Sequence, residues 1–245
     1  MQAPHPPLKD YYAREADRSG WVRQLFDRTA ADYDRVERAM AFGTGSWYRR
    51  RALARAGLRS GMRVLDIGTG TGLTAREAAH LAGNSGQVIG VDPSAGMMKR
   101  AKVPPSVLLL MGSAEAIPTP PVAVEFVSMG YALRHVVDVA MAFREFLRVL
   151  VPGGRVCLLE ITAPEGGLSR ALLRAYMRGV VPLMACCVAR HRDMPKLMRY
   201  YWDTIEACAA PGLILAAMRE AGFVDVYRHV ELGIFSEYCA RKPPH

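Results

Sequence analysis

The stretch VLDIGTGTG, residues 64–72, carries the most informative spacing of chemical groups in this chain. A short apolar run leads into three glycines at alternate positions, and Asp66 stands two residues before the first of them. Glycines at this spacing let the backbone turn sharply and approach a ligand, with the amides of a following helix directed at it. The dinucleotide fingerprint G-x-G-x-x-G needs a third small residue where Leu73 stands. The pattern D-x-G-x-G-x-G therefore favours a nucleotide ligand other than NAD.

A second acid, Asp92, ends the next apolar run, twenty residues after Gly72. A carboxylate at the end of this strand can accept hydrogen bonds from both hydroxyls of a ribose. Glycine turns and strand-end acids also occur without ligands. The loop together with Asp66 and Asp92 nevertheless predicts a site for S-adenosylmethionine (SAM).

These groups need a framework that brings several strand ends together. From about residue 63 the chain alternates apolar runs with segments of helical spacing, which predicts a parallel sheet covered by helices on both faces. At the C-terminus, VDVYRHV and IFSEYCA read as two strands joined in a hairpin. We therefore predict an α/β, Rossmann-like fold with a mostly parallel seven-stranded sheet and an antiparallel C-terminal strand. The expected runs are RVLDI, QVIGVD, VLLLM, AVEFVSMG and VCLLEI for strands, and TGLTAREAAHLAG, PSAGMMKRAKV and VAMAFREFLRVL for helices.

The predicted organisation is a single domain, residues 1–245. Residues 20–57 form an N-terminal helical cover, 63–161 the cofactor-binding core, 162–208 a helical cap, and 209–241 a helix followed by the hairpin. The cap is rich in methionine and aromatic residues, which make adaptable apolar walls and favour a hydrophobic ligand. The alternative is that these side chains are core under the sheet. They are Tyr176, Met177, Met184, Met194, Met198, Tyr200, Tyr201 and Trp202.

The net charge of +9 and the pI near 9.6 favour anionic partners. No run exceeds three basic residues, so an anionic membrane surface is favoured over nucleic acid. The most lipid-like run, residues 179–189, has eleven residues including a proline, too few to cross a bilayer. The partners we expect are a hydrophobic or lipid-like small molecule, a membrane surface and a second copy of the chain, with no nucleic acid.

Five cysteines form an odd count without C-x-x-C spacing, so neither a metal site nor a disulfide framework is indicated. We expect mostly buried, reduced thiols in a cytoplasmic protein, peripheral at the inner face of the membrane. The vicinal pair at 186 and 187 is either a packing feature or redox-active. The N-terminus, MQAPHPPLKD, has no apolar core of a signal peptide and reads as a frayed leader.

Three segments, VLDIGTGTG, GVDPSAGMM and RVLVPGGRVCLLEIT, resemble those of class I SAM-dependent methyltransferases. From about Leu25 onward the chain more narrowly resembles the ubiquinone/menaquinone C-methyltransferase (UbiE-type) family. FDRTAADYDRVERAMAFGTGSWYRR, YALRHVVD and AGFVDVYRHVELGIF are similar to its N-terminal signature, its F-G-L-R-N-V segment and its last helix and strand. The resemblance implies a SAM-dependent enzyme that methylates a ring carbon of a prenylated quinol or phenol.

The resemblance also implies where the cofactor is held. Thr71 would contact it from the loop and Asp92 from the ribose side, while Ser113 and Ala114 would lie against adenine and Gly130 near the methionine part. The complete predicted cofactor site is Asp66, Gly68, Gly70, Thr71, Gly72, Asp92, Pro93, Met97, Ser113, Ala114 and Gly130.

Methylation of a phenolic ring carbon requires loss of the hydroxyl proton, and a phenol with a pKa near 10 needs a base or a stabilising cation at neutral pH. The loop after the fourth strand carries Arg134 and His135. We predict that Arg134 stabilises the phenolate and that His135 is the base, directly or through water. The alternatives are a structural pair between Arg134 and Asp138 and an ordinary surface or helix-cap role for His135. Tyr201 is a third catalytic candidate, because its segment is similar to one that reaches over the substrate.

Several residues depart from the family's pattern. His135 stands where the family usually has Asn, and Glu37, Ala41, Gly45 and Tyr48 differ from its N-terminal signature. We interpret the chain as a paralogue with a related but altered acceptor. The competing functions are N- or O-methylation of phosphatidylethanolamine or of an aromatic small molecule, and an inactive subunit of a biosynthetic complex.

Overall fold

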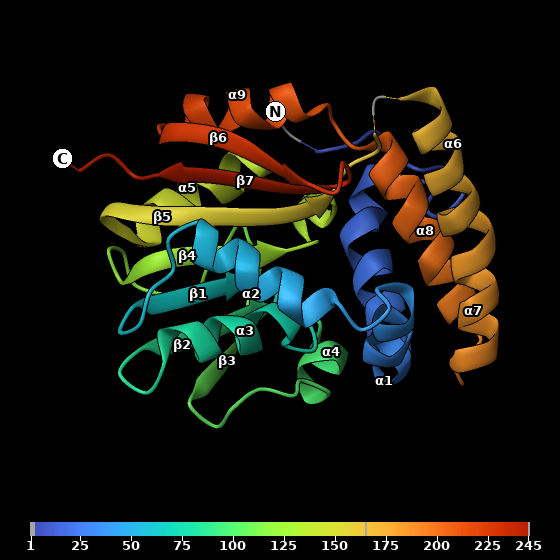
Figure 1. Ribbon diagram of the computed structural model, residues 1–245, viewed down its shortest axis with the longest axis horizontal. Helices are drawn as coiled ribbons and strands as arrows, with labels where there is room; N and C mark the ends of the chain where they lie inside the picture. Colours follow the sequence, from blue (N-terminus) through green and yellow to red (C-terminus); the bar gives the residue numbers. More distant parts are fainter. Residues whose placement is uncertain (1–2, 165, 245) are drawn as a thin grey trace.

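One sheet with the strand order β3-β2-β1-β4-β5-β7-β6 forms the centre of the computed structural model, which describes residues 3–164 and 166–244 (Figure 1). All neighbouring strands pair in parallel except β7, which is antiparallel to both β5 and β6. The predicted α/β fold and its C-terminal hairpin are confirmed. The strands are β1 (Arg63–Ile67), β2 (Gln87–Asp92), β3 (Val107–Met111), β4 (Val124–Gly130), β5 (Leu150–Ile161), β6 (Val224–Glu231) and β7 (Phe235–Arg241).

The central strands are mostly apolar because both of their faces are buried. In β1, Val64, Leu65 and Ile67 are almost fully buried, and Asp66 is the single acid among them. Its register places Asp66 between Gly90 of β2 and Ser128 of β4. The carboxyl ends of β2, β1 and β4 therefore lie in a row, where ligands bind in open α/β sheets.

Helices cover both faces of the sheet and one of its ends. On one face, α2 (Gly45–Arg55) packs with α3 (Leu73–Ala82), and on the other α5 (Val139–Val149) packs with α9 (Pro211–Ala221). Beyond the carboxyl ends of the strands lie α1 (Arg18–Met40), α8 (Met194–Ala207) and an outermost helical run (Figure 1). That run consists of α6 (Gly167–Ala175), the π-helical turn η3 (Tyr176–Val180) and α7 (Val181–Val188). Within the predicted cover, α1 thus lies over the ligand side, whereas α2 packs on a sheet face.

The methionine and aromatic residues of the predicted cap form a hydrophobic cluster between helices. Met177, Met194, Met198, Tyr200 and Trp202 are buried together with residues of α1 and α7. These side chains attach α7 and α8 to α1, so they form a core of their own between helices and not the core under the sheet that the alternative expected.

Two predicted element boundaries are wrong. The helix expected over residues 93–103 is the short α4 (Ala95–Lys99), because the Ser94 hydroxyl accepts a hydrogen bond from the Met97 amide and caps its start, leaving Pro93 outside. The fifth strand begins at Leu150 rather than Val156. It pairs first with Val124 and, after an irregularity, with Phe126, so the glycine-rich turn lies within the strand.

The described part of the N-terminal segment, from residue 3 onward, is not frayed as predicted, and residues 1–2 lie outside the described residues. His5 and Tyr12 are buried, and the Pro4 carbonyl accepts a hydrogen bond from the Ala209 amide at 2.7 Å. The cysteine prediction is also partly wrong, because Cys186 and Cys187 are exposed.

One helical run among the described residues, Gly167–Val188, is long and apolar enough to cross a membrane by length and composition. It extends well beyond the eleven-residue apolar run seen in the sequence. The two remaining short elements are 3₁₀ turns, η1 (Glu15–Asp17) and η2 (Leu133–His135).

Candidate active site

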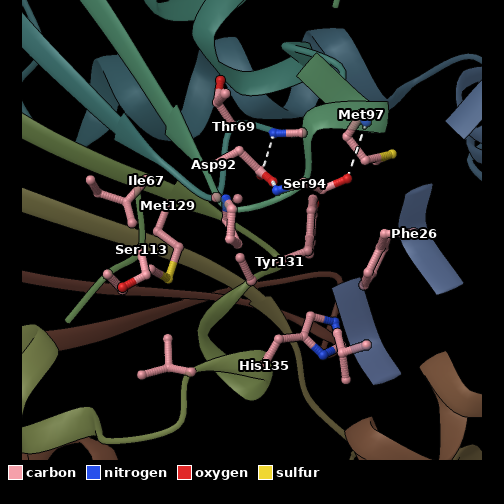
Figure 2. A pocket seen from close by; sticks show the side chains of 18 of the residues that line it. Phe26, Ile67, Thr69, Asp92, Ser94, Met97, Ser113, Met129, Tyr131 and His135 are labelled. Atoms are coloured by element: carbon pink, nitrogen blue, oxygen red, sulfur yellow. Dashed lines mark hydrogen bonds between the residues drawn. The ribbon is translucent and has the colours of Figure 1, made fainter. Parts of the chain in front are cut away.

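A cavity opens at the carboxyl ends of β1, β2 and β4, beneath α1 (Figure 2). Most of the residues predicted from the sequence line it, and four do not: Asp66, Gly72, Arg134 and Tyr201. The predicted residues in its wall are Gly68, Gly70, Thr71, Asp92, Pro93, Met97, Ser113, Ala114, Gly130 and His135.

The loop after β1 requires glycine at each of its three positions. Gly68, Gly70 and Gly72 have φ angles of 66°, 55° and 84°, the left-handed region that side chains disfavour. A Cβ at Gly68 would come within 2.6 Å of the Ala132 Cβ, and one at Gly72 within 2.3 Å of Val103. Gly72, at the start of α3, therefore lets the loop pack closely against Val103. Gly68 and Gly70 face the cavity.

Asp92 presents its carboxylate to the cavity from the end of β2. One oxygen accepts a hydrogen bond from the Gly70 amide at 2.8 Å and the other from the Ser94 amide at 2.7 Å (Figure 2). Burial raises the pKa of Asp92 to about 6, against the opposing effect of these two amides. Each oxygen keeps a further lone pair, so the carboxylate can still accept hydrogen bonds from a ligand.

Asp66 lies beneath the loop rather than in the cavity wall. Its side chain is fully buried and accepts a hydrogen bond from the Ser128 hydroxyl at 2.7 Å, across to β4. Burial raises the pKa of Asp66 to about 6. The structure thus gives this acid a supporting position between two strands.

Helix α1 is fastened to both cofactor-side loops by two carboxylates that the sequence analysis did not identify. Asp27 accepts hydrogen bonds from the Ser94 hydroxyl at 2.6 Å and from the Gly96 amide at 2.8 Å. Asp34 accepts one from the Thr71 hydroxyl at 2.5 Å. The two acids are seven residues apart, so they lie on one face of the helix two turns apart. This seven-residue spacing of two acids on a predicted helix is the feature of the sequence that could have indicated their shared role.

His135 enters the cavity wall from η2, with its ring directed toward Phe26 of α1 (Figure 2). The two rings meet edge to face at 5.3 Å, and Nδ1 lies 3.4 Å from the Tyr200 hydroxyl. Nε2 has no partner among the described residues. Burial, followed by the charge of Arg134, lowers the pKa of His135 well below its usual value, so the imidazole is neutral at physiological pH. The alternative of a surface histidine is therefore wrong.

Arg134 is fully buried behind the cavity wall. It forms an ion pair with Glu160 at 2.5 Å, and its guanidinium lies 3.9 Å from the centre of the Tyr201 ring. Burial alone would lower the pKa of Arg134, but the Glu160 carboxylate raises this pKa above its usual value. The alternative pair with Asp138 is wrong, because Asp138 caps the start of α5 through the Met141 amide. The catalytic roles of Arg134 and Tyr201 stay predictions.

Three further wall residues, Tyr33, Arg49 and Tyr131, were not assigned a role from the sequence. Tyr131 follows β4 directly and has a φ of 60°, which is uncommon for a residue with a side chain. The Arg49 guanidinium lies 5.1 Å from the centre of the Tyr131 ring. Arg49 comes from α2, so this contact depends on helix packing far from the glycine loop.

Outside the cavity, His229, Glu231 and Glu237 lie close enough together to be metal ligands. Both carboxylates, however, accept hydrogen bonds from Arg55 at 2.9 Å. The arginine already balances their charge, so we assign no metal to this cluster.

The sheet order, the glycine loop after β1 and the acid at the end of β2 together define a class I SAM-dependent methyltransferase. The SAM-dependent methyltransferase from Thermotoga maritima has the same fold, with a TM-score of 0.62 over 89% of this chain and 98% of that one at 21% identity. Residues 13–242 match the ubiE/COQ5 methyltransferase family, and the chain belongs to it.

Two relatives extend the comparison. A 2-phytyl-1,4-naphthoquinone methyltransferase from Thermosynechococcus vestitus is 33% identical, covering 86% of this chain and 94% of its own length. A demethylmenaquinone methyltransferase from Symbiobacterium thermophilum is 32% identical, covering 98% and 96%. The predicted family, enzyme class and cofactor are thereby confirmed.

The cavity residues fit SAM. Asp92 has acceptor positions left for ribose hydroxyls, and the left-handed Gly68 and Gly70 expose the loop backbone to the cavity at their two positions. Ser113 and Ala114 line the cavity beyond the β2 end, where adenine is expected. When bound, the cofactor supplies a methyl group on an electrophilic sulfonium.

Proposed function

We propose that this enzyme methylates a ring carbon of a prenylated quinol in its reduced form. The observation that carries this proposal is the composition of the cavity: apolar residues and a neutral histidine share one space with the cofactor loops. Val22 and Phe26 of α1 and Val136 after η2 supply the apolar part, beside His135. An apolar wall with few polar groups suits an aromatic ring.

The residues can prepare such a ring for methylation. Loss of a proton from a ring hydroxyl makes the neighbouring carbon nucleophilic. A C–C bond then forms, the sulfur–methyl bond breaks, and the ring carbon releases its proton. His135 is neutral and lines the cavity, and its buried Nε2 has no protein partner, so a turn of the ring toward the cavity would let this nitrogen accept a hydrogen bond from the hydroxyl, directly or through water. Helix α1 closes over the site and excludes water from the transfer.

The relatives support the choice of acceptor. Both are named for naphthoquinones, one of them carrying a phytyl chain. The departures from the family signature at Glu37 and Gly45 lie beside Arg49, since a Cβ at Gly45 would lie 2.6 Å from the Glu37 and Arg49 side chains. We take prenylated quinols as a class to be the acceptors.

Purified enzyme with methyl-labelled SAM tests this proposal. The acceptors are 2-phytyl-1,4-naphthoquinol, its oxidised quinone and phosphatidylethanolamine, with Asp92→Ala as the control variant. We expect label in a ring carbon of the quinol, located by mass-spectrometric fragmentation, and none in the quinone, which lacks a hydroxyl. Label on oxygen, or only in phosphatidylethanolamine, would refute the proposal. Failure to bind S-adenosylhomocysteine would favour the inactive-subunit reading.

We further propose that the outward face of α6–η3–α7 rests on an anionic membrane. Leu168, Leu172, Val180 and Leu183 are 76%, 64%, 49% and 67% exposed along this run, although it is apolar. The inward side packs on α8, where Arg174 pairs with Glu206 and Arg178 with Asp203. Such a helix suits the interface of a membrane better than its interior.

The charge of this region matches an anionic surface. Residues 166–207 carry seven basic and three acidic side chains. A polybasic surface beside exposed leucines combines two signals for membrane binding. A prenylated acceptor would be held in the same membrane. A homodimer stays a prediction.

Co-sedimentation with vesicles tests the membrane proposal. We expect wild type to bind phosphatidylcholine vesicles containing 30% phosphatidylglycerol and to bind pure phosphatidylcholine weakly. The double variant Leu172→Glu/Leu183→Glu should lose binding, whereas Leu213→Glu, at an exposed leucine of α9, should keep it. Equal binding by all three proteins would refute the proposal. A loss of mass in light scattering, seen only in the double variant, would instead make the face a dimer interface.

A further inference from the structure

We propose that Arg49 binds the α-carboxylate of the cofactor's methionine part. This assignment depends on the SAM site and not on the identity of the acceptor. Arg23 and Arg49 are the two arginines in the cavity wall. Arg23 is exposed to solvent, whereas Arg49 is 4% exposed. A buried arginine that reaches a cavity has donors to satisfy there.

The partners of Arg49 leave it short of acceptors. Glu37 accepts from Nη2 at 2.8 Å, and the Tyr131 ring lies under the guanidinium. The Nε donor is buried and has no partner among the described residues. Burial alone would lower the pKa of Arg49, but Tyr131 and Glu37 raise this pKa above its usual value, so the guanidinium stays charged. A guanidinium has five donors in a fixed fork that matches a carboxylate.

The order of the strands indicates which part of the cofactor reaches Arg49. Ser113 follows β3, Asp92 ends β2, Gly68 follows β1 and Gly130 ends β4, and these strands are consecutive neighbours. With adenine at Ser113 and ribose at Asp92, the remaining part of the cofactor extends along this row. It ends above β4, where Tyr131 follows Gly130.

Tyr131 fixes the position of that end. Its backbone has a left-handed φ of 60°, and its amide donates to the Leu159 carbonyl at 2.7 Å. A side chain held in a disfavoured backbone conformation at a ligand cavity is a common feature of functional sites. The ring thereby lies beneath Arg49, and Tyr33 lines the same end.

Charge also favours a zwitterionic ligand at this end. Glu37 balances the charge of Arg49, so the pair presents no large excess of positive charge. The methionine part carries an ammonium and a carboxylate, and its single carboxylate can accept from the Arg49 guanidinium, which is part of the cavity wall. Arg134 cannot take this role, because it lies outside the wall and is held by Glu160.

Two ligands that differ only in the amino-acid part test the assignment. S-adenosylhomocysteine carries the α-carboxylate, whereas 5′-methylthioadenosine keeps adenine, ribose and sulfur and lacks it. Calorimetry should show that Arg49→Gln weakens S-adenosylhomocysteine at least tenfold and changes methylthioadenosine less than twofold. Arg49→Lys should fall between wild type and Arg49→Gln. The matched control is Arg50→Gln on the same helix, whose arginine pairs with Glu77 and lies outside the cavity wall.

The other outcomes overturn the assignment. If Arg49→Gln leaves both affinities unchanged but alters the pH profile of turnover, the arginine faces the acceptor oxygen instead. If both affinities fall together, its role is to hold the fold of the site. Because methylthioadenosine binding reports an intact adenosine site, a misfolded variant is recognised directly. Loss of the quinol activity alone would challenge the proposed function and leave this assignment standing.

Discussion

The Thr71 hydroxyl in the glycine loop donates a hydrogen bond to the Asp34 carboxylate on helix α1, with 2.5 Å between the two oxygens. Asp27 makes the equivalent connection from the same helix to the loop after β2. Helix α1 is therefore attached to both loops that form the cofactor site. We expect cofactor entry and product release to involve separation of this helix from at least one of them.

We expect Asp34→Ala to release the product faster. The variant removes a hydrogen bond to a charged acceptor, a contact that contributes on the order of 1–3 kcal/mol. The dissociation rate of S-adenosylhomocysteine, measured by stopped flow, should rise at least about threefold. Asp17→Ala is the control, because it removes only an exposed pair with Arg14. An unchanged dissociation rate would mean that α1 does not limit release.

Cofactor affinity should fall as the pH drops below about 6. The pKa of Asp92 in the folded protein, about 6, is above its ordinary value, so the carboxyl becomes protonated as the pH falls below 6. The stability that the protonated carboxyl contributes to the fold is lost as the pH rises through 6. Ribose hydroxyls donate to the ionised form, so binding opposes protonation. Calorimetry with S-adenosylhomocysteine should show up to about tenfold weaker binding at pH 5 than at pH 7.5.

Two variants identify the titrating group. Asp92→Asn should bind more weakly at every pH and lose the pH dependence. Asp66→Asn should keep it, although burial raises the pKa of Asp66 to the same value. A pH dependence that disappears only in Asp66→Asn would assign the effect to the acid beneath the loop.

His135 should not appear as a titrating group in the activity profile near pH 6.5. Burial and nearby Arg134 hold its pKa well below that value, so it is already neutral where the enzyme works. We expect kcat/KM to lack an inflection there, and His135→Ala to lower kcat at least about tenfold through loss of a hydrogen-bond acceptor. An inflection near pH 6.5 in wild type that is absent from His135→Ala would contradict this.

Breaking the buried pair of Arg134 and Glu160 should destabilise the fold. Removing one partner leaves an uncompensated buried charge, which costs about 3–5 kcal/mol. Urea unfolding of Glu160→Gln should show a loss of this order, and the double variant Arg134→Met/Glu160→Met should recover part of it. Glu125→Gln, which breaks an exposed pair with Arg63, should cost about 1 kcal/mol or less. Similar losses for Glu160→Gln and Glu125→Gln would refute the expectation.

Features that depend on neighbouring residues in the chain could be predicted from the sequence. The strands, the glycine loop and Asp92 follow from apolar runs and local spacing, and all lie where the pattern indicated. The start of β5 could not be predicted, because its first residue, Leu150, pairs with Val124, which is distant in sequence. Similarly, Ser94 rather than Pro93 begins α4 through a side-chain cap.

The parts of the site that were missed depend on packing between distant elements. Asp27 and Asp34 reach the loops because α1 lies across the strand ends, and Arg49 reaches Tyr131 because α2 packs beside α3. Arg134 was assigned to the cavity because its loop lies there, but Glu160 on β5 draws the guanidinium behind the wall. The side-chain direction within a loop is set by such partners, and no periodicity in the sequence records it.

The π-helical turn η3 between α6 and α7 sets the rotation of one helix relative to the other. A π-helical turn holds one residue more per hydrogen-bonded ring than an α-helical turn. The residues of this turn are wound more widely than in an α-helix, so five of them complete about the rotation that four α-helical residues complete. Deleting a single residue there, with a return to regular winding, would leave α7 facing as it does now. Winding all five residues as an α-helix would instead rotate α7 by roughly 100°, the angle between successive residues. The direction of the outward apolar face therefore depends on the backbone winding of this turn as well as on the residues that the face carries.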